Sequence, residues 1–112
     1  MEVTYKNSTL RKYAEDEKFS IRKLGARRSD LYIRRIGDLM AQETLEGTRN
    51  LPGHFHELTG NRKGQWACDL DQPYRLIFEP HEDPIPTNSG GQYIWCEIKG
   101  VEIQEIDNYH SK

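Results

Sequence analysis

The sequence predicts an α+β protein in which an N-terminal strand and two helices pack on a mainly antiparallel sheet of four or five strands. Apolar residues recur at helical spacing up to Gln42. Beyond Pro52 and Gly53 the apolar period changes to two, which is typical of strands. Turn residues separate the two regions, so helices occupy the first half and the sheet mainly the second.

The first half begins with Met1–Tyr5, which alternates enough to form a short edge strand. The side chains of residues 7–9 (Asn-Ser-Thr) can cap a helix that runs through Leu10 and Tyr13 and ends between Glu17 and Gly25. A long core helix is expected over about Ala26–Gln42. Its apolar face is formed by Leu24, Leu31, Tyr32, Ile36, Leu39 and Met40.

The second half reads as a meander of strands. Phe55 and Leu58 flank the first, and Gln65–Leu70 and Tyr74–Glu79 form the next two, joined by a tight turn at residues 71–73. Residues 81–91 are a loop by composition, and 93–98 fits either a short strand or a helical turn. A closing strand then carries Val101, Ile103 and Ile106. If Trp66, Cys68, Leu70, Leu76 and Phe78 face the helices, Arg75 stands on the open side of the sheet.

The composition indicates a single domain spanning residues 1–112. The chain has 112 residues, 35% of them hydrophobic and 30% charged, which suits one modest core. With neither a membrane-spanning run nor the apolar centre of a signal peptide, a cytoplasmic protein is expected. Cys68 and Cys96 lack a zinc or disulfide spacing and are interpreted as buried thiols.

Charge is distributed unevenly along the chain. Residues 1–64 carry 13 Lys and Arg against 9 Asp and Glu, whereas residues 65–112 carry 3 against 9. The basic half is the better face for a polyanion. Its doublets, such as Arg27-Arg28 and Arg34-Arg35, are interpreted as solvated helix faces that could also meet an acidic partner.

The candidate chemistry lies in residues 51–80 and at the C-terminus. RNA cleavage without a metal needs acid and base groups beside cations, and histidine can serve in either role near neutral pH. The candidate acid and base groups are His54, His56, His81 and His110. Arg75 offers a planar fork for phosphate, Arg62 and Lys63 add charge from a neighbouring turn, and Tyr109 can stack on a base.

Each of these residues also has a structural interpretation. A single histidine near a strand is more often a surface or hydrogen-bonded residue, which applies above all to His54 and His81. Residues 61–64 (Asn-Arg-Lys-Gly) also suit an ordinary hairpin turn. Arg75, in an otherwise apolar strand, needs a partner such as Glu79, Asp69 or an external anion.

Three segments carry a family resemblance: residues 56–66 (HELTGNRKGQW), residues 74–78 (YRLIF) and the terminal Tyr109-His110. Together they resemble the RelE/ParE superfamily of bacterial toxins, closest to the HigB or killer-protein branch. The resemblance implies a RelE/ParE-like, microbial-RNase-like fold and a toxin of a type II toxin-antitoxin system.

By resemblance the protein is a ribosome-dependent mRNA endoribonuclease that needs no metal or other cofactor. His56, Arg75, Tyr109 and His110 then occupy the active-site positions, and Arg62, Lys63 and Asn108 contact RNA. The implied partners are the ribosome with its mRNA and a HigA-like helix-turn-helix antitoxin. Operator DNA would be bound only through the antitoxin.

Two departures from the branch leave other functions open. Thr59 stands where the branch often has lysine, and Asn108 precedes Tyr109 where it commonly has aspartate, with Asp107 one residue earlier. The sequence pI is about 6.1, which weakens long-range attraction to RNA. The alternatives are a non-enzymatic ParE-like inhibitor of DNA gyrase and a toxin homologue with weak or no activity.

Overall fold

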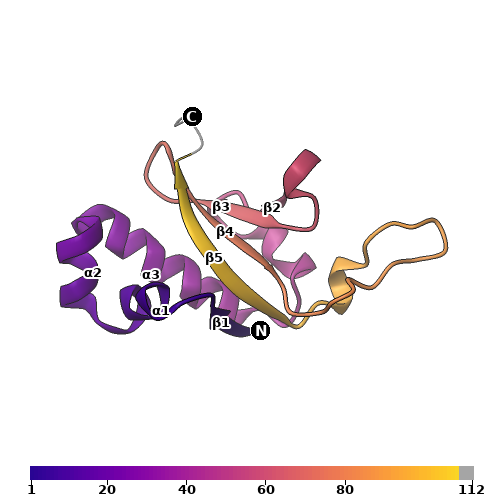
Figure 1. Ribbon diagram of the computed structural model, residues 1–112, viewed down its shortest axis with the longest axis horizontal. Coiled ribbons are helices and arrows are strands. Elements are labelled where there is room, and N and C mark those ends of the chain that lie inside the picture. The colour runs from indigo at the N-terminus through magenta and orange to yellow at the C-terminus, as the bar shows by residue number, and fades with distance from the viewer. Residues whose placement is uncertain (109–112) are drawn as a thin grey trace.

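The computed structural model describes residues 1–108 and has an α+β fold with three helices and a five-stranded mixed sheet (Figure 1). The strands are β1 (Glu2–Tyr5), β2 (His56–Glu57), β3 (Trp66–Asp69), β4 (Tyr74–Pro80) and β5 (Gly100–Asn108). Their spatial order is β1-β5-β4-β3-β2. The β1 strand is an edge strand parallel to β5, and the other pairs are antiparallel, so the predicted fold class is confirmed.

The helices are α1 (Ser8–Glu15), α2 (Glu17–Leu24) and α3 (Ala26–Ala41). The expected cap at the start of α1 is present, because the Asn7 side chain accepts a hydrogen bond from the Leu10 amide. The segment expected to form one helix is divided at Asp16. The backbone amide of Asp16 closes α1 on the Lys12 carbonyl, and its carboxylate caps α2 at Phe19.

The main core lies between the helices and one face of the sheet. Buried side chains of α1 and α3 pack there against the inward-facing residues of the strands; the cluster includes Leu10, Tyr32, Ile36, Leu39, Trp66, Cys68, Leu76, Phe78 and Ile103. Burial raises the pKa of the Cys68 thiol, which keeps it protonated and unreactive. Cys96 is exposed, so the prediction that it is buried was wrong.

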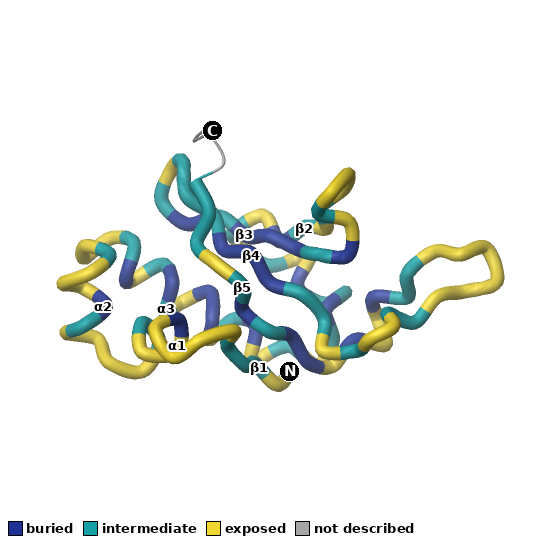
Figure 2. Tube along the Cα trace, in the orientation of Figure 1, coloured by how far each residue is buried: buried dark blue, intermediate teal, exposed yellow. Residues whose placement is uncertain are grey.

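An extension over residues 81–99 leaves the sheet after β4 and returns to it at β5 (Figure 1). Its outer part is exposed, as Figure 2 shows, whereas Trp95 and Ile98 at its base are buried. The ambiguous residues 93–98 include a short 3₁₀ helix, Trp95–Glu97. Further 3₁₀ turns occupy Glu46–Asn50 and Gly60–Arg62. Within residues 1–108, no helix combines the length and apolar character needed to cross a membrane.

Two arginines of α3 bind the strands rather than solvent. Arg35 is buried and donates from Nε to the Asp69 carbonyl at 2.8 Å. Gly53 passes so close that a Cβ there would lie 2.6 Å from the same Nε, and its φ of 109° also requires glycine. The expectation of a solvated doublet at Arg34-Arg35 was therefore wrong for Arg35, although Arg34 is exposed.

Arg28 fastens the start of α3 to the turn between β3 and β4. Its Nε and Nη2 donate to the two carboxylate oxygens of Asp71 at 2.9 and 3.1 Å. Its guanidinium carbon lies 3.5 Å from the Tyr74 ring centroid, a cation–π contact. Arg28 is thus a structural residue, while its neighbour Arg27 is exposed.

An Arg28→Ala variant should lose about 1–2 kcal/mol of unfolding free energy, because it removes a bidentate ion pair and the ring contact together. Urea denaturation followed by circular dichroism measures the change. The matched Arg27→Ala variant should shift by less than about 0.5 kcal/mol. Equal losses in the two variants would contradict this role for Arg28.

A bulge in β5 decides which face its last residues occupy. Phe78 pairs with Ile103 but Ile77 pairs with Glu105, so Gln104 is an extra residue with no pairing partner in β4. As a result Glu105 and Asp107 share a face with Ile77 and Arg75, while Ile106 and Asn108 lie on the helix side with Leu76 and Tyr74.

Candidate functional site

The candidate site lies on the sheet face opposite the helices, here called the open face. One row across it contains His56, Ala67, Ile77 and Glu105, and the next contains Asp69, Arg75 and Asp107. Ala67 and Ile77 are fully buried yet lie outside the main core cluster, so polar side chains must cover them. The expectation that Arg75 stands on this side is confirmed by the register.

Arg75 is held by a carboxylate of the neighbouring strand. Its Nε donates to Oδ2 of Asp107 at 3.0 Å, and both side chains are about four-fifths buried. The partners suggested by the sequence were Glu79, Asp69 or an external anion. Asp69 does lie opposite Arg75 in the register, whereas Glu79 accepts from the Gln65 amide at 3.3 Å.

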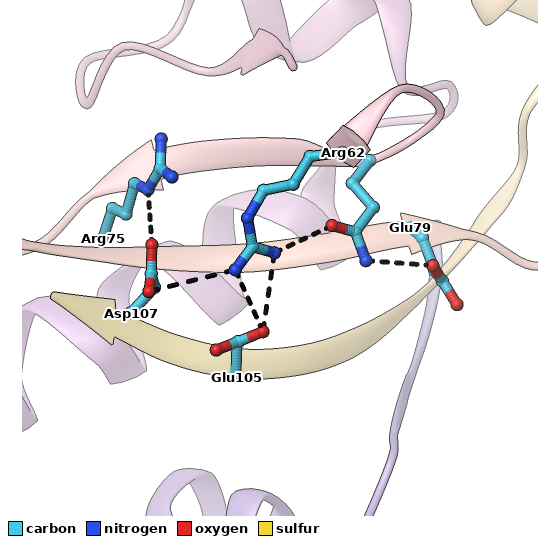
Figure 3. Close-up of polar contacts among 6 residues, drawn as sticks. Arg62, Arg75, Glu79, Glu105 and Asp107 are labelled. Atoms are coloured by element: carbon cyan, nitrogen blue, oxygen red, sulfur yellow. Dashed lines mark hydrogen bonds and ion pairs between the residues drawn. The ribbon is translucent and has the colours of Figure 1, made fainter. Parts of the chain in front are cut away.

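Arg62 reaches across the sheet to Asp107 and to the nearby Glu105 (Figure 3). It donates to Gln65 Oε1 at 2.9 Å, and its Nη2 lies 3.4 Å from Glu105 and 3.9 Å from Asp107. Because Arg62 starts beside β3 and meets β5, its guanidinium extends over β4. The open face thus holds two arginines already bound to acidic partners.

His56 is oriented by the backbone turn that precedes it. Its Nδ1 lies 2.7 Å from the His54 carbonyl oxygen, and the two imidazole rings stack at 4.0 Å between centroids. Since a carbonyl can only accept, Nδ1 carries the proton and Nε2 of the neutral ring keeps its lone pair. His54 itself has a φ of 54°, a left-handed conformation that directs this carbonyl toward His56.

The open face brings together some predicted residues and separates others. His56 lies two strands across and two residues along the sheet from Arg75, so their backbones are roughly 12 Å apart at the usual strand dimensions. The Lys63 ammonium instead lies 5.6 Å from the ring centroid of Tyr93, in the extension. Asn108 is opposite Tyr74, on the helix side. Tyr109 and His110 lie outside the described residues and stay predictions.

The remaining histidine candidate, His81, lies just after β4 and lines a cavity with Glu79 and Glu102, away from His56. Its Nε2 lies 2.7 Å from Thr4 Oγ1, and its Nδ1 lies 3.5 Å from Glu2, so it ties the end of β4 to β1. This arrangement supports the structural interpretation of His81. Among residues 1–108, no group of three or more His, Cys, Asp or Glu side chains is placed to hold a metal ion.

Sequence reasoning named Asp69 and Glu79 as possible partners of Arg75 but did not place Glu102, Glu105 and Asp107 on the same face. Asp69, Glu79 and Glu102 lie on it beside Glu105 and Asp107, against the two arginines. The alternation of Glu105 and Asp107 was visible in the sequence. Assigning them to the face of Arg75, however, needs the bulge at Gln104, which shifts the register by one residue.

Comparisons with known proteins give likenesses among solved structures but not among sequences. No protein-family model matches the chain, and no curated protein matches its sequence. Among solved structures, the chain is similar to the YoeB/ParE toxin from Agrobacterium tumefaciens. The identity is 16%, the match covers 96% of this chain and 98% of that chain, and the TM-score is 0.47. We draw no functional argument from a likeness at this level.

An Asp107→Asn variant should bind anionic polymers more tightly, because a polyanion no longer has to displace the carboxylate from Arg75 and Arg62. The expected gain is about fivefold in affinity for heparin at low salt, the size of one partly exposed ion pair. Titration of labelled heparin measures it. Glu43→Gln makes the same charge change at an exposed site after α3. An equal gain in affinity there would mean that the change in net charge, and not the release of the two arginines, causes the effect.

Proposed function

We propose that this protein is the toxin of a type II toxin-antitoxin system and cleaves mRNA on the ribosome without a metal. The sequence resemblance over residues 56–66, 74–78 and 109–110 supports the class. The observation that carries the proposal is that His56, Arg62 and Arg75 share the open face with Asp107, and that β5 leads from this face directly into Tyr109-His110.

The reaction requires a base, an acid and positive charge at phosphorus. A base removes the proton of the ribose 2′-OH, and the 2′-oxygen forms a new bond to phosphorus. The bond from phosphorus to the 5′-oxygen breaks, and an acid protonates that oxygen. The products are a 2′,3′-cyclic phosphate and a 5′-OH.

His56 suits the base role in this scheme. Its Nδ1–H is committed to the His54 carbonyl, so the Nε2 lone pair can accept the 2′-OH proton. His110 then serves as the acid that protonates the 5′-oxygen. The hydrogen bond to the backbone carbonyl of His54 limits rotation of the His56 ring, which preserves the orientation of Nε2.

Arg75 and Arg62 supply the charge that stabilises the transition state. Their partners Asp107 and Glu105 hold the guanidinium groups in position until a phosphate takes their place. Lys63 contacts the RNA away from the reacting bond, and Tyr109 positions a base. Because the carboxylates must be displaced, free RNA binds weakly and the ribosome is needed to present the mRNA.

Purified ribosomes with a defined mRNA, read by primer extension, test this function. His56→Ala and Arg75→Ala should lower the cleavage rate by a factor of about 100 or more, since each removes a group acting in the transition state. His110→Ala should behave in the same way. His54→Ala is the control, because it keeps the backbone carbonyl that orients His56, and it should retain most of the activity.

Growth arrest in cells that express the same variants separates the alternatives. Undiminished toxicity of both Arg75→Ala and His110→Ala would contradict the nuclease assignment. Arrest with DNA breaks and intact mRNA would favour a gyrase inhibitor. The third alternative is a homologue with weak or no activity, which would agree with the carboxylate-bound arginines and with Thr59. In that case the wild type would not arrest growth either.

The proposed protein partner is a HigA-like helix-turn-helix antitoxin, which would also be the only route to operator DNA. Arg27 and Arg34 on α3 are exposed and can meet an acidic partner, Arg34 by exchanging its 3.1 Å pair with Asp30, whereas Arg28 and Arg35 are committed to the fold. The purified pair should co-elute in gel filtration, and the antitoxin should suppress cleavage in the ribosome assay. Separate elution would count against the complex.

A further inference from the structure

A cavity lies beside the β2 edge of the sheet, next to the open face. Its volume is about 490 Å³, and its lining includes Glu57, Lys63, Asn88, Gln92, Tyr93 and Trp95. Two pairs of residues that are neighbours in the sequence, His56-Glu57 and Arg62-Lys63, link the cavity to the candidate site. His56 and Arg62 serve the open face, whereas the next residues, Glu57 and Lys63, line the cavity. A single-stranded chain that crosses the edge would therefore meet both.

The cavity has a firmly held aromatic wall. Trp95 is buried, packs edge-on against Trp66 at 5.4 Å between ring centroids, and donates from Nε1 to Glu57 at 3.0 Å. Tyr93 is half-buried and packs on Trp95 at 5.0 Å. Lys63 approaches the Tyr93 ring centroid only to 5.6 Å, near the outer limit of cation–π contact. An aromatic ligand that displaces Lys63 from this ring therefore loses little interaction energy.

The polar groups of the cavity are also held in position. Glu57 accepts from Arg49 with one oxygen and from Trp95 with the other, and each carboxylate oxygen has a second lone pair to offer. The Asn88 side chain accepts from the Gly90 and Gln92 amides, which fixes the turn at the cavity rim. A ring face, a carboxylate and an ammonium thus surround one space.

We propose that this cavity binds one nucleobase of single-stranded RNA, next to the nucleotides on the open face. The base stacks on Tyr93, an exocyclic amino group donates to Glu57, and the attached phosphate meets Lys63. The inference deepens the proposed function by adding a subsite to its RNA path. A peptide anchor suits the cavity less well, because most of the lining is polar and carries both charge signs.

Binding of RNA hexamers that carry 2′-O-methyl groups tests the subsite, since such RNA cannot be cleaved. Fluorescence anisotropy of a labelled oligocytidine gives its dissociation constant. Tyr93→Leu should weaken binding about tenfold, within the range for loss of one stacked base, and Tyr93→Phe should keep it. Oligouridine, which lacks an exocyclic amino group, should bind several-fold more weakly than oligocytidine to the wild type.

Tyr5→Leu is the matched control, because Tyr5 is also half-buried beside the core and has Arg11 at 5.4 Å from its ring. It should bind oligocytidine as the wild type does. The comparison of cytidine with uridine needs no variant, so it still reports on the cavity if Tyr93→Leu folds poorly. Circular dichroism of each variant checks the fold.

Equal binding of oligocytidine by the wild type and Tyr93→Leu would overturn the subsite, and so would equal binding of oligocytidine and oligouridine by the wild type. Loss of antitoxin co-elution in Tyr93→Leu with unchanged RNA binding would mark the cavity as a protein-docking site instead. Failure of the proposed function looks different. RNA binding that depends on Tyr93 without ribosomal cleavage would leave the subsite standing and remove the nuclease.

Discussion

The structure depends on the double-sided burial of β4. This strand pairs with β3 and β5, and its residues Leu76, Ile77 and Phe78 have no exposed surface. Charges carried by the same strand cannot turn toward the core, and they must be matched on the open face by side chains from neighbouring segments. Arg75 is matched by Asp107 from β5 and Glu79 by Gln65, while Arg62 extends over the strand. Packing of the interior therefore dictates the electrostatics of the surface where chemistry is proposed.

Much of the fold was predictable because local signals agreed with the final packing. The Asn7 cap, the apolar face of α3 and the alternation in β3 and β4 each point to the element that forms. The predictions failed where a residue's role depends on a distant segment. Arg28 and Arg35 look like members of solvated doublets, and only the approach of Asp71 and the Asp69 carbonyl makes them structural. Asp16 was missed as a helix boundary because it serves as the cap of two helices at once.

The candidate site was predictable to a smaller extent. The register confirms the open-face position of Arg75, but its ion-pair partner was misjudged because the bulge in β5 has no clear sequence signal. The aromatic cavity was missed for another reason. Residues 81–91 have the composition of a plain loop, and residues 93–98 fit two kinds of structure, so nothing local indicates that Tyr93 and Trp95 meet Glu57 and Lys63 from other parts of the chain. Tertiary proximity alone creates that surface.

The extra residue Gln104 also has an evolutionary consequence. Loss of Gln104 itself would remove the bulge and leave the faces of β5 unchanged, because Ile103 and Glu105 would still pair with Phe78 and Ile77. A relative that lacks one residue after the bulge would instead exchange the faces from the deletion to the strand end, so the counterpart of Asp107 would lie opposite that of Leu76. Conserving the amino acids would then not conserve the ion pair. Homologues of different length in this strand should be aligned by face rather than by residue identity, and loss of the bulge residue should be tolerated more readily than a single deletion beyond it.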